Sequence, residues 1–200
     1  MRTNLPVTQR ECDYPAQELL VSQTDERGLI THCNQGFVNV SGYSYEELLG
    51  QPHNLVRHPD MPEEAFKDMW QTIGRGRPWS GVVKNRCKNG DHYWVHANVS
   101  PVLENGKPRG YISVRMKPTP QQVSDAEALY ARIISERGRR PTLKLHAGGV
   151  RKVGVADLPS RIHRLSLGQR MAIAMFVFAL AVLQPGVLGL TGATLLATQA

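Results

Sequence analysis

The sequence contains few cysteines and few aromatic residues, and residues 171–200 contain no Asp, Glu, Lys or Arg at all. The three cysteines, Cys12, Cys33 and Cys87, show no CxxC spacing, which argues against a disulfide framework or a thiolate zinc site and is typical of a reducing compartment. Residues 1–19 contain no apolar run, so we expect no secretory signal peptide there. Hydrophobic residues make up 41% of the 200, which excludes a disordered chain and a polytopic membrane protein.

The positive charge is concentrated in one segment. The formal net charge is +7, yet residues 132–170 alone hold ten Lys and Arg against two acidic residues, which leaves residues 1–131 almost neutral. No aromatic residues are interleaved with these cations, so we expect no nucleic-acid interface. A cationic segment directly before an uncharged apolar one is typical of the cytoplasmic side of a membrane anchor. We therefore expect residues 139–170, of which 139–165 lack periodicity, to be a basic linker, and residues 171–200 to be an anchor in the inner membrane.

The expected anchor has two possible geometries. Met171–Leu183 is shorter than the roughly 20 residues of a single span. Gln184–Gly186 then interrupts the apolar pattern, so the segment is either one kinked span or a shallow hairpin. A buried soluble helix is the alternative, but the segment offers no polar face.

Alternating apolar and polar residues predict an α+β domain in residues 1–118. Short helices are expected between the second and third strands, gathered on one side of a five-stranded antiparallel sheet. Asn89–Gly90 is typical of a tight hairpin turn between two of these strands. The strands are expected at residues 19–24, 29–33, 79–86, 92–99 and 110–116.

Residues of helix-capping type mark the expected helix starts. Asn34 is placed to cap one helix, and Ser44 opens a capping box for a second. Asp60 with Glu63 repeats the same spacing and predicts the start of an amphipathic helix that carries an apolar stripe. Thr119, followed by a proline, predicts a further helix after the last strand.

Three blocks of sequence carry a resemblance to a known family. The run Ile30–Gly50 resembles the signature of PAS sensor domains. The blocks RHPDMP (Arg57–Pro62) and KNGDHYW (Lys88–Trp94) narrow the resemblance to bacterial aerotaxis receptors, which are PAS-domain chemoreceptors. This resemblance implies a PAS fold that binds FAD non-covalently and reads redox state or oxygen supply.

The resemblance also implies a domain organisation. In that family the sensor passes its signal to a HAMP segment and then to a domain that contacts the chemotaxis kinase and adaptor, and neither is expected within these 200 residues. We expect a homodimer whose PAS domain lies in the cytoplasm, able to sense and to anchor but not to address a kinase unaided. The expected parts are an N-terminal cap (1–18), the PAS domain (19–118), a linker helix (119–138), the basic linker (139–170) and a truncated anchor (171–200).

One loop supplies most of the candidate cofactor-binding residues. The resemblance implies that Arg57, His58 and Asp60 bind FAD. The guanidinium of Arg57 suits the diphosphate, whereas a carboxylate beside phosphates is repulsive, so Asp60 is expected to act indirectly. His53 lies in the same loop and is a weaker candidate.

Side-chain chemistry adds four further candidates. The indoles of Trp70 and Trp79 suit a flat apolar slot, although ordinary core packing explains Trp70 equally well. The carboxamides of Asn34 and Asn85 can each meet the edge of a flavin with a donor and an acceptor. Helix capping is an equal alternative for Asn34, while an asparagine within a strand, as at Asn85, favours a functional role.

The sequence allows two alternatives to FAD binding. Haem is the main rival cofactor, because one axial histidine suffices and the expected PAS domain contains five: His32, His53, His58, His92 and His96. A cofactor-free PAS module for protein interaction is the other alternative. The photochemistry of light-oxygen-voltage domains needs a cysteine in the loop that residues 51–61 occupy, and none is there. No nucleophile–base pair, phosphate-binding glycine loop or metal-ligand spacing indicates an enzyme.

Overall fold

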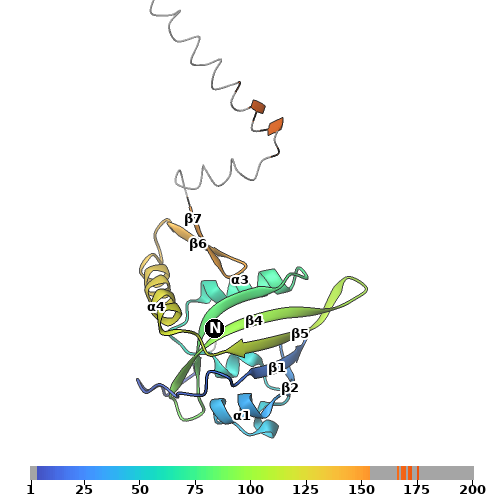
Figure 1. Cartoon of the computed structure of the whole chain (residues 1–200), viewed down its shortest axis with the longest axis vertical. Helices are drawn as coiled ribbons and strands as arrows, with labels where there is room; N and C mark the ends of the chain where they lie inside the picture. Colours follow the sequence, from blue (N-terminus) through green and yellow to red (C-terminus); the bar gives the residue numbers. More distant parts are fainter. Residues whose placement is uncertain (1–3, 154–165, 167, 170, 173–174, 176–200) are drawn as a thin grey trace, which may run out of the picture. The chain divides into compact units, whose positions relative to one another are not determined.

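The computed structural model describes residues 4–153 together with 166, 168, 169, 171, 172 and 175 (Figure 1). The chain divides into two compact units, Met1–Lys152 and Val153–Ala200, and the description below concerns the first. The expected anchor and most of the expected basic linker lie outside the described residues. Within the described part of the chain, no helix is both long and apolar enough to cross a membrane.

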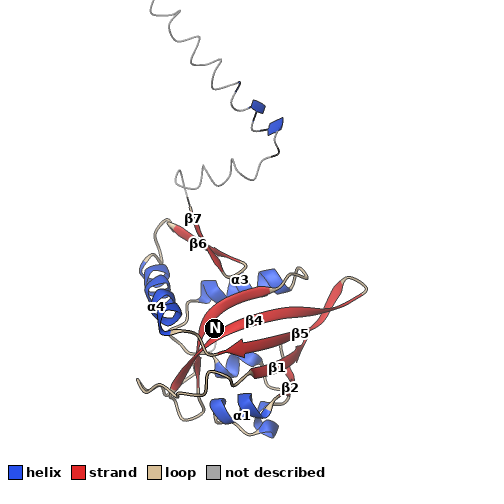
Figure 2. Cartoon of the chain, viewed as in Figure 1, coloured by secondary structure: helices blue, strands red, loops and turns tan. Residues whose placement is uncertain are grey.

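A five-stranded antiparallel sheet forms the centre of this unit (Figure 2). Its strand order is β2-β1-β5-β4-β3, so the first two strands and the last three meet where β1 pairs with β5. The predicted α+β fold class is therefore confirmed. The strands are β1 (Leu20–Asp25), β2 (Ile30–Cys33), β3 (Trp79–Arg86), β4 (His92–Glu104) and β5 (Lys107–Met116).

Strands β4 and β5 are longer than the alternation predicted. They continue to the turn at Asn105 and Gly106, whose backbone φ angles of 51° and 75° are those of a tight hairpin turn. The residues nearest the turn, such as Leu103, are exposed, so hydrophobic alternation gave no signal there.

Four helices connect β2 to β3: α1 (Gln35–Ser41), α2 (Tyr45–Leu48), the 3₁₀ helix η1 (His53–Val56) and α3 (Glu63–Ile73). Asn34 caps α1 by accepting a hydrogen bond from the backbone N–H of Phe37, and Ser44 forms the predicted capping box with Glu47. Their apolar faces close the core, whose most deeply buried side chains include Leu20, Phe37 and Tyr93.

The predicted cap of α3 is wrong. This helix begins at Glu63 after Pro62, and no side chain caps it. The Asp60 carboxylate instead pairs with the Lys84 ammonium at 3.0 Å. Two glutamates in the first turn, Glu63 and Glu64, interact favourably with the positive end of the helix and make a side-chain cap less necessary.

The structure adds a hairpin that the sequence analysis did not predict. Helix α4 (Pro120–Ser135) begins at the capping box of Thr119, as expected, and the hydroxyl of Tyr130 donates to the carbonyl of Val82 on β3. Strands β6 (Leu143–His146) and β7 (Gly149–Lys152) then form a two-stranded antiparallel hairpin within the segment expected to lack periodicity. The sequence of β6 alternates between leucine and polar residues, but over only four positions, and β7 is exposed throughout, so the alternation was too short to reveal the hairpin.

Candidate functional site

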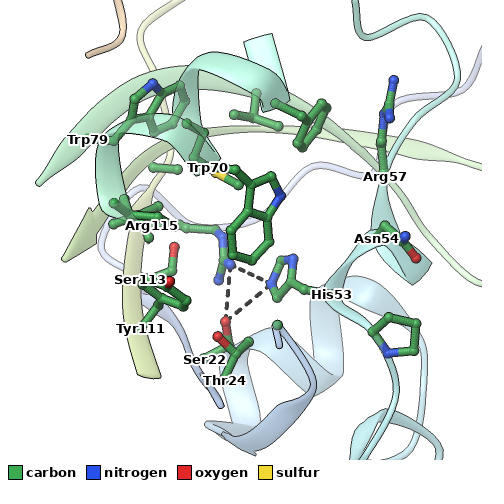
Figure 3. A pocket seen from close by; sticks show the side chains of 18 of the residues that line it. Ser22, Thr24, His53, Asn54, Arg57, Trp70, Trp79, Tyr111, Ser113 and Arg115 are labelled. Carbon is green, nitrogen blue, oxygen red and sulfur yellow. Dashed lines mark hydrogen bonds between the residues drawn. The ribbon is translucent and has the colours of Figure 1, made fainter. Parts of the chain in front are cut away.

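A cavity of about 290 Å³ opens between α3 and the sheet (Figure 3). This volume lies at the lower end of the usual range for small-molecule sites, about 300–1,000 Å³. It suits a flat ring system better than a whole dinucleotide, whose remainder would have to extend past the opening. The apolar lining comes from α3 and from the facing strands: Phe66, Met69, Trp70, Ile73, Trp79, Val83, Ala97 and Val99.

Polar side chains gather on one wall of this cavity, and we call Ser22, His53 and Arg115 the pocket floor. One guanidinium nitrogen, Nη2 of Arg115, donates to Ser22 Oγ at 3.1 Å and to His53 Nε2 at 2.6 Å (Figure 3). Because a guanidinium can only donate, His53 Nε2 must be the acceptor, which places the imidazole proton on Nδ1. Burial and the neighbouring cation lower the pKa of His53 to about 3, so its ring is neutral near pH 7.

Arg115 is a buried cation whose charge the protein does not neutralise. Its exposed fraction is 4%, and burial lowers its pKa to about 10, which leaves it positively charged near pH 7. Within the described residues it forms no salt bridge, and its second terminal nitrogen, Nη1, has no hydrogen-bond partner. The hydroxyl of Ser113, which also lines the cavity, is likewise buried without a partner. Unpaired buried charges are costly, so this wall is suited to an acceptor-rich or anionic ligand.

Two of the predicted residues, Asn85 and Trp79, also line the cavity. Asn85 lies on β3, is 4% exposed and lines the cavity. Trp79 is equally buried, and its indole N–H donates to the Asp68 carboxylate at 2.8 Å. Trp79 was expected to suit a flat apolar slot and Asn85 to have a functional role, and the structure places both in the lining of the cavity.

Trp70 lies at the rim of the cavity. It is 39% exposed and packs edge-to-face on Tyr111, with ring centroids 5.4 Å apart. Its six-membered ring also fills the space beside Gly28, where a Cβ atom would lie 2.8 Å from the indole. Trp70 therefore packs against neighbouring residues and also lines the cavity, so the two interpretations of this side chain are compatible.

Arg57 reaches the edge of the cavity, but its two neighbours in the motif do not line it. Its guanidinium stacks on Phe66 at 4.4 Å and donates to the carbonyl of Met61, while Nε is buried without a partner. His58 is 2% exposed and accepts a hydrogen bond from the backbone N–H of Asp60. Burial and the nearby Lys84 lower the pKa of His58 to about 4. His58 and Asp60 thus brace the segment that carries Arg57.

Asn34 does not line the cavity. Its side-chain oxygen accepts from the backbone N–H groups of Val21 and Phe37, and its nitrogen donates to the carbonyl of Leu19. These bonds use the side chain to hold α1 against β1. Of the two alternatives for Asn34, this placement favours capping.

Arg115, Ser22 and Ser113 were not among the residues predicted to form the site. A signal was present, because Tyr111, Ser113 and Arg115 alternate along β5 and therefore share one face of the sheet. Polar residues on the core-facing side of a strand are unusual, and they mark the wall of a polar site.

The described histidines and cysteines narrow the chemistry. Of the five histidines weighed as haem ligands, only His53 lines the cavity, and its Nε2 is engaged by Arg115. None of the three cysteines lines it. Among the described residues, no cluster of His, Cys, Asp or Glu side chains is arranged to hold a metal ion.

Comparisons with known proteins agree on the fold. A family model described as "PAS fold" matches residues 30–115. The dark structure of the blue-light photoreceptor Aureochrome1 LOV superposes with a TM-score of 0.50 at 22% identity, covering 57% of this chain and 88% of that one. At this identity the likeness concerns the fold alone.

Two curated proteins are similar in sequence. The aerotaxis receptor of Escherichia coli (strain K12) is 49% identical over 155 residues, which is 77% of this chain and 30% of the receptor. The nitrogen fixation regulatory protein of Klebsiella pneumoniae is 34% identical over 96 residues, 48% of this chain and 19% of that protein. The chain therefore spans less than a third of the length of either relative.

Proposed function

Residues 30–115 belong to the PAS fold family, and the chain resembles the N-terminal portion of aerotaxis receptors; from this premise we propose that it is the sensing part of a redox receptor that binds FAD non-covalently. The observation that carries the proposal is the pocket floor. A buried guanidinium with an unpartnered N–H, facing an apolar wall formed by α3 and the sheet, suits the acceptor-rich edge of a flat heteroaromatic ring.

The lining residues divide the work of binding. The apolar side chains of α3, among them Met69 and Trp70, would cover one face of a ring, and Val83 and Val99 of the sheet would cover the other. Asn85 and Arg115 would meet polar atoms at the ring edge. Arg57, at the opening, would neutralise phosphate charge outside the slot.

The residues present also suit a charge-dependent signal. Bound FAD would supply a ring that accepts and releases electrons. Arg115 stays cationic near pH 7, so it favours added negative charge in the cavity, whereas His53, with its low pKa, stays neutral and does not compete for that charge. Asn85 can present either its oxygen or its nitrogen, so its contacts can differ between two redox states.

We further propose that the signal leaves through elements that pack on the sheet. Tyr130 of α4 is bonded to the backbone of β3, the strand that carries Asn85, so a shift of β3 biases α4. In the whole receptor a HAMP segment and a domain that contacts the kinase and adaptor would receive that bias, in a homodimer. The cationic residues of 139–170 and the apolar residues 171–200 would tether the chain to the inner membrane, with the PAS domain in the cytoplasm.

Haem binding and a cofactor-free interaction module are the two alternatives that an experiment can distinguish from FAD binding. Haem is disfavoured because the one imidazole in the cavity already accepts a bond from Arg115 and the cavity is small. In a cofactor-free interaction module, no ligand would compensate the buried charge of Arg115. We therefore propose a sensor rather than an enzyme.

Colour decides among these functions. The whole chain, purified in mild detergent and dialysed extensively, is expected to be yellow, to show the absorption bands of a flavin and to release FAD on denaturation. A Soret band would mean haem, and protein that stays colourless after incubation with FAD would mean an interaction module. Either result would contradict the proposal.

A further inference from the structure

One carboxylate on α3 accepts hydrogen bonds from three donors on two other elements. Asp68 Oδ2 accepts from the indole N–H of Trp79 and from the backbone N–H of Gly148, both at 2.8 Å. Its other oxygen, Oδ1, accepts from the backbone N–H of Ala147 at 2.9 Å. Asp68 does not line the cavity, whereas Trp79 does. The carboxylate therefore lies behind the pocket wall and bonds outward to the hairpin β6–β7.

The tip of this hairpin is shaped to hold a negative charge. Its two-residue turn consists of Ala147 and Gly148, with φ angles of 53° and 82°. A left-handed backbone at both positions is typical of a type I′ turn, and here the two successive N–H groups converge on one carboxylate. Alanine rarely adopts this conformation, which indicates that the bonds to Asp68 help to hold it.

The same tip rests against the start of β3. A Cβ atom on Gly148 would lie 1.5 Å from the backbone oxygen of Ser80, the residue after Trp79, so no larger residue fits without moving the hairpin. Both strands of the hairpin are otherwise largely exposed, with Leu145 as the side chain that packs on the core. The base of the hairpin is held separately, where Thr142 is hydrogen-bonded to Glu136 and Arg132, so Asp68 fixes the position of the tip.

We propose that Asp68 is a positioning residue that joins the pocket-lining Trp79 to the hairpin β6–β7, so that a displacement of the indole by the pocket ligand loosens or tightens the hairpin. Residues 153–170 and the apolar segment follow the hairpin in sequence, so this link is a route by which a change in the pocket reaches them. The inference rests on the proposed function only for the identity of the ligand, and thermodynamic linkage requires the effect to be reciprocal.

The first test needs no ligand. Amide hydrogen exchange is measured by mass spectrometry on the whole chain, comparing Asp68→Asn with the unsubstituted protein. An asparagine presents an NH₂ group to donors that need acceptors, so exchange in residues 143–152 is expected to be at least tenfold faster. Asp13→Asn is the matched control, because Asp13 is exposed and pairs with Lys117, and its exchange pattern is expected to be unchanged. Equal hairpin exchange in the Asp68 variant would overturn the proposal.

The second test runs in the opposite direction and guards against general unfolding. Gly148→Ala places a Cβ atom against the backbone oxygen of Ser80 and so displaces the hairpin tip, while every residue that lines the cavity keeps its identity. In a background in which Trp70 and Trp94 are replaced by phenylalanine, Trp79 is the single tryptophan. Its quenching by acrylamide is expected to be at least twofold greater with Gly148→Ala than in the same background with Gly148. Slow exchange in β4 confirms that the domain remains folded. Unchanged quenching would mean that hairpin and indole are independent.

The third test separates this proposal from the proposed function. Saturated with FAD, the unsubstituted chain is expected to differ at least threefold in hairpin exchange between the oxidised and the reduced cofactor. Trp79→Phe keeps an aromatic ring but removes the N–H donor, and should abolish that difference. A flavoprotein without any difference would overturn the link and leave the proposed function intact. A chain that binds no FAD would overturn the proposed function, while the first two tests still decide the link.

Discussion

The pocket floor and the Arg57–Asp60 segment both contain a buried arginine and a histidine with a lowered pKa, yet the protein treats them differently. Both guanidiniums lie over a phenylalanine ring, Arg57 over Phe66 and Arg115 over Phe37, and each has one buried nitrogen without a partner. The carboxylates of Glu63 and Glu64 partly offset the effect of burial on the pKa of Arg57. The hydrogen-bond partners of Arg115 are neutral, and within the described residues no carboxylate pairs with it. The segment is largely stabilised by the protein itself, whereas the floor is left to be completed by something else.

This difference separates two ways of affecting a ligand. A residue that holds the backbone of a binding loop lowers affinity and stability together when it is removed. A buried charge that awaits a ligand destabilises the empty protein, so its removal lowers affinity while leaving stability equal or higher. Substitution in either region should therefore lower the affinity for FAD. Only substitution in the Arg57–Asp60 segment should also lower the stability of the protein without FAD.

The largest effect is expected from Arg115→Met. Hydrogen bonds to a charged group contribute about 1.5–3 kcal/mol, so affinity for FAD should fall about 10- to 100-fold. Fluorescence titration of the ligand-free chain with FAD measures this change. In the variant, the Ser22 hydroxyl, already 3.2 Å from His53 Nε2, can donate to it directly, so neither group is left unpaired. Affinity within twofold of the unsubstituted chain would remove the floor from the binding site.

A smaller loss is expected from Arg57→Ala. The guanidinium at the pocket edge would contribute one charged contact to a phosphate that remains partly solvated, so affinity for FAD should fall about tenfold. Because the side chain also covers Phe66 and bonds to Met61, the free energy of unfolding should fall by about 1–2 kcal/mol. Urea unfolding and FAD titration of the same preparation measure both quantities. Full retention of both would show that the motif arginine has neither role.

Asp60→Asn tests the indirect role assigned to the rest of the motif. Its pair with Lys84 is partly solvated, so stability should fall by at most about 1 kcal/mol and FAD affinity only a few-fold. The double variant Asp60→Asn/Arg57→Ala should bind FAD at most about twofold more weakly than Arg57→Ala alone, because Asp60 acts through Arg57. Fully additive losses in FAD titrations would instead indicate a direct contact.

The two regions are expected to differ least in the dependence of stability on pH, to which each contributes one histidine. The pKa values of His53 and His58, about 3 and about 4, lie below the unfolded value of 6.5, so the unfolded chain binds more protons below pH 6.5. The free energy of unfolding should fall as the pH is lowered from about 6.5 toward 5, by up to about 1.4 kcal/mol per pH unit for each group.

Substitution can assign that slope to its sources. His53→Gln and His58→Asn each preserve the hydrogen-bonding atom on the occupied side of the ring and should each flatten the dependence seen in urea unfolding. His32→Gln, at an exposed position, is the control. A slope that survives both substitutions would show that other groups cause it.

The sequence was sufficient for the fold and for part of the site, and the limits have physical reasons. Alternation and capping residues predicted the five strands and most helix starts because those signals are local. Asn85 was found because an asparagine is out of place in a strand. Arg115 was missed because its significance lies in a buried guanidinium nitrogen that has no partner among the described residues, and only the folded chain shows what surrounds a side chain.

The hairpin β6–β7 was missed for a related reason. Its turn residues, Ala147 and Gly148, are held by the side chain of Asp68, which is distant in the sequence. Neither segment alone carries a signal for this contact. Contacts that depend on a long-range partner are the part of the structure that local patterns cannot predict.

The central claim is that the cationic floor exists to hold the ligand, and the most direct measurement is the free energy of unfolding of the unsubstituted chain and of Arg115→Met, each with and without FAD. FAD at 100 times its dissociation constant should stabilise the unsubstituted chain by about 2.7 kcal/mol. The variant should be at least as stable as the unsubstituted chain without FAD, and at the same FAD concentration it should gain clearly less. Equal stabilisation of both proteins, or a variant that is already unstable without FAD, would contradict the account.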